Sequence, residues 1–106
     1  MNARSGTRVP CDLLITVVSV DSPCAFSESC HVILVNPNGC AARISRAVAV
    51  GTMVRLQGLP VPEPVIARVT ACINLGKGEN LWLMGLAIDE PGNVWGLDDV
   101  PADWRE

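Results

Sequence analysis

Two arginines near the start of the sequence, Arg4 and Arg8, have the residue type and the spacing best suited to holding an anion. A guanidinium group stays charged and offers a planar pair of donors that can grip a phosphate with two parallel hydrogen bonds. Residues 1–58 also carry five arginines against three acidic residues, so this half of the chain is mildly basic. The two arginines could equally be solvated charges near a chain end, and both interpretations stay open at this point.

A second polar group is the segment Asn36-Pro37-Asn38-Gly39, which is rich in the residues that form tight turns. It stands between two apolar stretches, so it predicts a turn that joins two strands. The segment could be a turn and nothing more.

Five cysteines and one histidine are the remaining candidates for chemistry; the cysteines are Cys11, Cys24, Cys30, Cys40 and Cys72. An odd number of cysteines without an export signal predicts free thiols, because cytosolic thiols are kept reduced. A metal site made of Cys24, Cys30 and His31 would have a spacing unlike the common zinc patterns and would lack a fourth ligand. We therefore expect no metal site.

The sequence also argues against an enzyme. The only evident nucleophile beside His31 is its neighbour Cys30, and adjacent residues of a strand point to opposite faces. The acidic residues Asp98, Asp99 and Asp103 fall in what reads as a solvated tail. No glycine-rich loop leads from a strand into a helix, as a nucleotide cradle of that type requires. We expect no catalytic activity and no cofactor.

Length and composition limit the kind of protein that positions these residues. The chain has 106 residues, which suits a single domain of residues 1–106. Hydrophobic residues make up 49% and charged residues 18%, which excludes a disordered chain and a coiled coil. No apolar run approaches the roughly 18 residues that span a bilayer, and the first residues lack the apolar stretch of a signal peptide. We expect a cytoplasmic protein.

Alternating apolar and polar residues predict six strands, at residues 9–20, 29–35, 40–45, 52–59, 65–74 and 81–88. Short strands at hairpin-like spacing favour a closed antiparallel barrel, since closure removes the unpaired edges of a sheet. The fold class is therefore all-β, a six-stranded antiparallel barrel with a short C-terminal helical turn. The alternation places Val54, Leu56, Val69, Ala71 and Ile73 in the core. In the tail, residues 93–106, Trp95 and Trp104 should pack on the barrel.

The order of these segments resembles the PilZ domain family, in particular its small single-domain members. The resemblance is carried by Arg4-x-x-x-Arg8 before the first strand, by the 36–39 turn and by Gly51 at the opening of a later strand. The tail segments 93–97 and 100–104 add to it. The resemblance implies a PilZ-like barrel that binds cyclic di-GMP, commonly as a stacked dimer of the messenger, and catalyses nothing. Residues 1–10 would form a flexible arm over the ligand.

Carried over residue by residue, the resemblance implies a cyclic di-GMP site made of Arg4, Arg8, Asn36, Asn38 and Gly39. The second motif of the family, Asp/Asn-x-Ser-x-x-Gly, aligns in two ways. If Asn36 takes its first position, Asn38 replaces the serine and Ala41 the glycine. If Gly39 is the motif glycine, which suits a positive φ in a tight turn, Leu34 stands where a polar residue is expected.

The leading hypothesis is thus a cyclic di-GMP receptor or adaptor in bacterial second-messenger signalling, with a downstream protein partner and with neither nucleic acid nor membrane as partner. The alternative is a PilZ-like module with a degenerate second motif, which acts by protein–protein interaction alone. A third class comprises an enzyme or a binder of single-stranded nucleic acid on a similar barrel. It fits poorly, because the chain has no tyrosine and one phenylalanine for base stacking.

Overall fold

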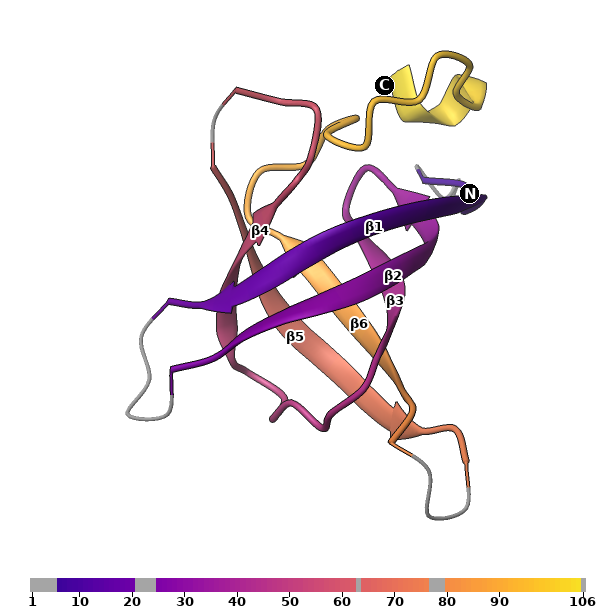
Figure 1. The fold of residues 1–106 in the computed structure, drawn as a ribbon. Coiled ribbons are helices and arrows are strands. Elements are labelled where there is room, and N and C mark those ends of the chain that lie inside the picture. The colour runs from indigo at the N-terminus through magenta and orange to yellow at the C-terminus, as the bar shows by residue number, and fades with distance from the viewer. Residues whose placement is uncertain (1–5, 21–24, 63, 77–79, 106) are drawn as a thin grey trace.

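The computed structural model describes residues 6–20, 25–62, 64–76 and 80–105. As predicted, these form an all-β closed barrel of six antiparallel strands (Figure 1). The strands are β1 (Val9–Ser19), β2 (Ser27–Asn36), β3 (Gly39–Ile44), β4 (Met53–Gln57), β5 (Val65–Asn74) and β6 (Trp82–Ile88). The described helical structure is one 3-10 turn, η1 (Ala102–Arg105). No described helix has the length and apolarity that crossing a bilayer requires.

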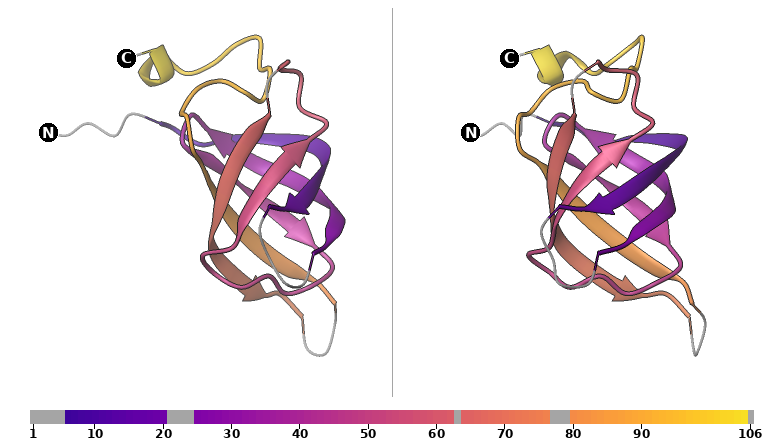
Figure 2. Two further views of the ribbon diagram at one scale, coloured as in Figure 1. Left: turned by 90° about the vertical axis from the view of Figure 1, so that its left-hand side faces the viewer. Right: turned by 60° about the vertical axis from the view of Figure 1, so that its left-hand side comes forward.

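The barrel closes through contacts between strands that are distant in the sequence. The order around the barrel is β1-β2-β3-β6-β5-β4, and β4 pairs with β1 to complete the ring (Figure 2). In that last pairing Val17 lies opposite Leu56, and both side chains are buried. Every strand has two antiparallel neighbours, so the sheet has no free edge along which another chain could add.

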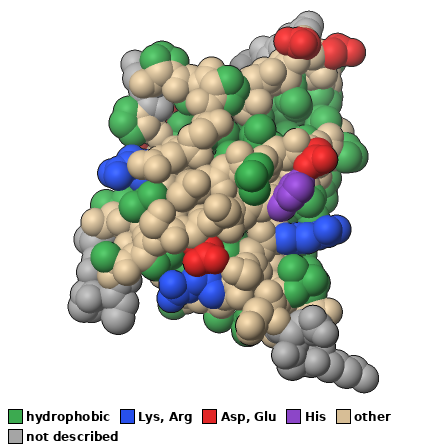
Figure 3. Space-filling model, in the orientation of Figure 1, with side chains coloured by type: hydrophobic (Ala, Val, Ile, Leu, Met, Phe, Trp, Pro, Cys, Tyr) green, Lys and Arg blue, Asp and Glu red, His purple; other side chains and the backbone are tan. Residues whose placement is uncertain are grey.

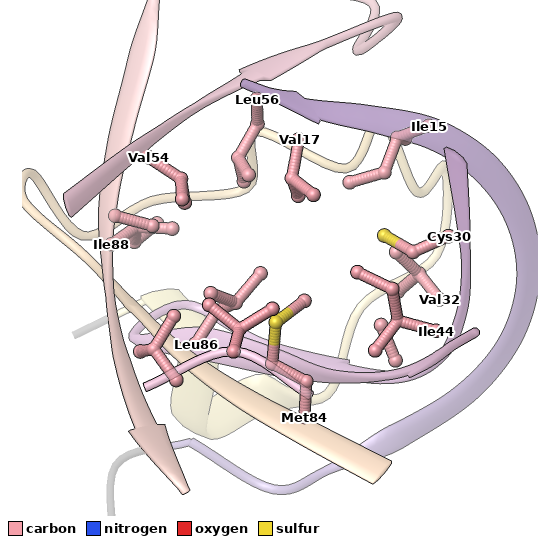
Figure 4. Close-up of a cluster of buried hydrophobic side chains, with 14 of the residues drawn as sticks. Ile15, Val17, Cys30, Val32, Ile44, Val54, Leu56, Met84, Leu86 and Ile88 are labelled. Carbon is pink, nitrogen blue, oxygen red and sulfur yellow. The ribbon is translucent and has the colours of Figure 1, made fainter. Parts of the chain in front are cut away.

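The core lies inside the barrel and consists mainly of valine, leucine and isoleucine side chains, with Met84 and Cys30 among them (Figure 4). Val17, Val32, Val54, Val69 and Met84 have no exposed surface. Each comes from a different strand, where it alternates with outward-facing neighbours. A barrel of this size is filled by its own side chains, so a ligand has to bind on the outer surface or at an end.

The alternation fails along β5. Val54, Leu56 and Val69 are buried as predicted, but Ala71 is only half-buried and Ile73 is 56% exposed. The prediction that Ala71 and Ile73 lie in the core is therefore wrong.

A β-bulge explains the change of face. Val69 lies opposite Leu86, whereas Ala71, two residues further on, lies opposite the adjacent Gly85. Thr70 is thus an extra residue in β5. An extra residue turns each later side chain of the strand to the opposite face of the sheet. Beyond the bulge Cys72 takes the inward position, where its sulfur accepts a hydrogen bond from the Val48 amide at 3.4 Å.

The segment after β6 crosses one end of the barrel, as the ribbon views show (Figures 1 and 2). Trp95 is 4% exposed, and its indole nitrogen donates a hydrogen bond of 2.8 Å to the carbonyl oxygen of Asn36. Trp104 in η1 is half-buried and packs against the core cluster. The tail therefore contributes to the apolar packing at the end of the barrel where β2 turns into β3.

Candidate ligand-binding site

A hollow of about 330 Å³ lies on the outside of the barrel, at the end where β2 turns into β3. Its lining is Arg8, Leu34, Val35, Asn36, Asn38, Gly39, Cys40, Ala41, Thr70, Gly85, Leu86 and Ala87. Four of the five residues proposed from the resemblance, Arg8, Asn36, Asn38 and Gly39, thus line one surface feature. The fifth, Arg4, lies outside the described residues. The barrel brings together residues that the sequence separates by a whole hairpin.

Small side chains make the floor of the hollow. Ala41 on β3 lies directly opposite Gly85 on β6, and Ala87 is the next outward residue of β6. Thr70, the bulge residue of β5, lies next to Gly85. A β-carbon on Gly85 would stand 2.9 Å from the Thr70 hydroxyl oxygen. The absence of a side chain at position 85 therefore keeps the floor open and flat.

The 36–39 turn is held by the side chain of Asn36. Its amide oxygen accepts hydrogen bonds from the backbone nitrogens of Asn38 and Gly39, both at 2.9 Å. Its amide nitrogen donates to the carbonyl oxygen of Gly6 at 3.1 Å. Asparagine is well suited to such a turn, because its side chain can bond its own backbone two residues on. Asn36 therefore acts mainly as a structural residue of the site.

Asn38 is placed differently from Asn36. Its side chain is exposed at the rim of the hollow, and within the described part of the chain no hydrogen bond engages its amide. An amide has two donors and one acceptor available for a polar ligand. Asn38 is thus the asparagine of the turn that can meet a ligand.

Gly39 is required for a reason other than the one that the sequence suggests. Its φ is not positive; the described glycines with positive φ are Gly6, Gly51, Gly58 and Gly96. Gly39 therefore does not use the left-handed conformation that glycine readily adopts in a tight turn. The cause lies across the sheet, where a β-carbon on Gly39 would stand 1.9 Å from the carbonyl oxygen of Leu86.

Arg8 lies at the rim of the hollow, immediately before β1, and its side chain is exposed. No carboxylate of the described residues lies within ion-pair distance of its guanidinium. A guanidinium without an acidic partner is free to bind an incoming anion, for which it provides a planar fork of donors.

The residues just before Arg8 are held by the tail. The Asp103 carboxylate accepts hydrogen bonds from the Thr7 hydroxyl at 2.7 Å and from the backbone nitrogens of Thr7 and Gly6 at 2.9 and 3.1 Å. The bond from the Thr7 hydroxyl is the main reason why the pKa of Asp103 is lowered, and the two backbone bonds add to it. The Trp104 indole donates to the Thr7 carbonyl oxygen at 2.7 Å. Of the predicted arm, residues 6 and 7 are thus anchored, and Val9 and Pro10 belong to β1.

The register of β5 and β6 adds Arg68, a residue that the sequence analysis does not assign to the site. Arg68 lies opposite Ala87, which lines the hollow, and it is exposed between the buried Ala67 and Val69. It therefore points outward beside the hollow. Arg8 flanks the hollow on the β1 side and Arg68 on the β5 side, so two cations flank an apolar floor.

The buried thiols Cys30 and Cys40 are weak nucleophiles. Burial strongly raises the pKa of the Cys40 thiol, and burial also raises the pKa of Cys30 to about 11. A thiol with a raised pKa holds little of the nucleophilic thiolate near neutral pH. Cys11, Cys30, Cys40 and Cys72 are free, whereas Cys24 lies outside the described residues.

Cys30 and His31, two of the candidates for a metal site or for catalysis, lie on opposite faces of β2. Cys30 points into the core and is 3% exposed, whereas His31 lies on the outer face and pairs with Asp12. Figure 3 shows the histidine with an acidic side chain beside it on the barrel surface. Within the described ranges no three side chains of the metal-binding types form a cluster. The His31–Asp12 pair lies outside the lining of the hollow.

Compared with known proteins, the chain matches no family model, and no curated protein is significantly similar to it in sequence. What the hollow could bind depends on the chemistry of its own residues. These offer the Arg8 guanidinium, the Asn38 amide and a flat floor of small side chains, and Arg68 stands next to the lining residue Ala87. Such a surface suits an anionic ligand with a planar ring.

Proposed function

We propose that the protein is a PilZ-like receptor for cyclic di-GMP, which binds the messenger in the hollow and acts by binding and not by catalysis. The observation that supports this most is that Arg8 and the 36–39 turn line the same hollow. These are two of the segments in which the sequence resembles the PilZ domain family. In that family they hold the same ligand.

The chemistry of each residue fits a part of the messenger. Arg8 can grip a phosphate or the O6/N7 edge of a guanine with two parallel hydrogen bonds. Asn38 can bond a base edge with its unengaged amide. The floor of Ala41, Gly85 and Ala87 offers a flat apolar surface to the face of a purine.

Arg68 supplies the second positive charge that a ligand with two phosphates needs. It lies on the opposite side of the floor from Arg8. The hollow, of about 330 Å³, is at the lower end of small-molecule sites, so it accommodates one guanine and its phosphate. The other half of the messenger would extend over the surface toward Arg68. Arg4, whose placement is not described, keeps the role that the resemblance implies.

The second candidate is a PilZ-like module that does not bind nucleotide and acts by protein–protein interaction. The engagement of Asn36 favours it, because both ends of that side-chain amide are already used by the turn and by Gly6. Leu34 and Ala41 also line the hollow where the family motif has a polar residue or a glycine. In this case the tail and the hollow would present a surface to a partner protein only.

Titration calorimetry with cyclic di-GMP distinguishes the two candidates. We expect saturable binding by the wild type and an affinity at least about tenfold lower for Arg8→Ala, since each lost charge-assisted hydrogen bond contributes about 1.5–3 kcal/mol. Arg8→Lys should restore little, because lysine lacks the planar fork. Arg55→Ala is the matched control, as Arg55 lies on β4, which does not line the hollow.

Absence of binding at about 100 μM messenger, with the barrel still folded, would contradict the receptor and leave the interaction module. Equal affinities for Arg8→Ala and Arg55→Ala would place the ligand elsewhere on the barrel. Both results can be interpreted without knowledge of the downstream partner.

A further inference from the structure

The beginning of the described chain is tied to its end. Gly6 and Thr7 donate three hydrogen bonds to one oxygen of the Asp103 carboxylate, and the Trp104 indole bonds the Thr7 carbonyl oxygen. The two segments lie side by side in both ribbon figures, with η1 next to the start of β1 (Figures 1 and 2). We call this set of four contacts the Thr7–Asp103 latch.

The latch is continuous with the hollow. Arg8 follows Thr7 directly, so the direction in which its side chain leaves the backbone is set by the held residues before it. Gly6 also accepts the amide hydrogen bond from Asn36, whose other atoms shape the 36–39 turn. Trp95 bonds the Asn36 carbonyl oxygen from the tail side. Tail, latch, turn and Arg8 thus form one connected hydrogen-bond network.

One feature indicates that the latch can open. The second carboxylate oxygen of Asp103, Oδ1, is buried and has no hydrogen-bond partner among the described residues. A buried acceptor without a partner is costly, so the closed latch is less stable than its four contacts alone would suggest.

We propose that Asp103, Thr7 and Trp104 are positioning residues for Arg8, so that closure of the latch and binding of the anionic ligand favour each other. This inference rests on the proposed function of the hollow. Arg8 contacts the ligand from its fixed place only when the latch is closed. A ligand that binds the closed form better shifts the population toward it, and by linkage the closed latch raises the affinity for the ligand. Ligand binding would then change the tail surface offered to a partner.

A pair of variants at Thr7 provides the first test, with cyclic di-GMP as the probe. Thr7→Val removes the hydroxyl bond of the latch and keeps the shape of the side chain, whereas Thr7→Ser keeps the hydroxyl. We expect calorimetry to show affinity lowered about fivefold or more in Thr7→Val, the usual size of such coupling, and close to wild type in Thr7→Ser. Thr7 does not line the hollow, so a direct contact with the ligand is not removed.

A second test uses the tail. Asp103→Asn weakens the latch by removing its charge, and Asp99→Asn is the control, an exposed acidic residue of the same segment. Affinity should fall in the first and stay unchanged in the second. Hydrogen exchange of the wild type should slow at Thr7 and at the Trp104 indole when cyclic di-GMP is added, which a purely structural tail contact would not produce.

The outcomes separate the two proposals. Binding by the wild type with equal affinity in Thr7→Val, Thr7→Ser and Asp103→Asn would overturn the coupling and leave the receptor in place. No binding by the folded wild type would overturn both. Should Asp103→Asn fail to fold, the comparison of Thr7→Val with Thr7→Ser and the exchange at Trp104 decide the question.

Discussion

Gly39 and Leu86 approach so closely across the β3–β6 pair that a β-carbon on Gly39 would stand 1.9 Å from the Leu86 carbonyl oxygen. The contact is with backbone, which cannot rotate away as a side chain can. It lies at the edge of the hollow, where the 36–39 turn begins β3. The close approach of the two strands therefore shapes both the barrel and the candidate site.

Gly39→Ala should destabilise the barrel, because the methyl group can be placed only if β3 and β6 move apart. Overpacking of this kind costs about 1–3 kcal/mol in the free energy of unfolding. Urea unfolding would measure the change. Gly92→Ala is the control, since a β-carbon there has no neighbour within 4 Å. Equal unfolding midpoints for the two variants would contradict the close approach.

Gly85→Val should block the hollow, and the barrel should accommodate it by rotation of the Thr70 side chain, whose hydroxyl would otherwise stand 2.9 Å from the new β-carbon. The new side chain would stand on the outward face beside Thr70 and cover the floor, and valine is favoured in strands. We expect the affinity for cyclic di-GMP to fall by at least about tenfold, which corresponds to 1.4 kcal/mol. Ser29→Val, at an exposed strand position outside the lining of the hollow, should bind as the wild type does. Unimpaired binding by Gly85→Val would show that the ligand does not bind on this floor.

Arg68→Ala should weaken binding and reduce its dependence on salt. Arg68 lies across from Ala87 and would neutralise the part of the ligand that Arg8 does not reach. The loss expected for one charge-assisted contact is about 1.5–3 kcal/mol, or roughly tenfold or more in affinity. Titrations at two salt concentrations, beside Arg55→Ala, would measure both effects. Identical behaviour of the two variants would exclude Arg68 from the site.

Acid should open the Thr7–Asp103 latch. The folded-state pKa of Asp103 lies below its ordinary value of 3.8, mainly because the carboxylate accepts the Thr7 hydroxyl bond. A lowered pKa means that the stabilisation is fully present above the ordinary value and is lost as the pH falls through the folded-state pKa. The difference in melting temperature between wild type and Asp103→Asn should therefore shrink on acidification below about pH 4. A difference that stays constant down to pH 2 would show that the charge of Asp103 does not hold the latch.

The sequence by itself determined the strands and the turns, because these follow from local patterns, and the number and spacing of the strands predicted the closed barrel. Period-two alternation was enough to place Val54, Leu56 and Val69 in the core. The residue types of the 36–39 segment were enough to predict a turn, since proline and asparagine favour turn conformations wherever they stand. The PilZ-like pattern of residues selected Arg8 and Asn38, which the structure places on one hollow.

Only the tertiary structure decided the features that depend on how distant strands align. The bulge at Thr70 exchanged the faces of β5 and exposed Ile73, because a single extra residue changes the register without changing the alternation in the sequence. The same register put Arg68 beside the hollow, and the approach of β6 made a glycine necessary at position 39. The bond between Thr7 and Asp103 joins the two ends of the chain. No local pattern encodes such contacts, because they form only when closure of the barrel brings distant segments of the chain together.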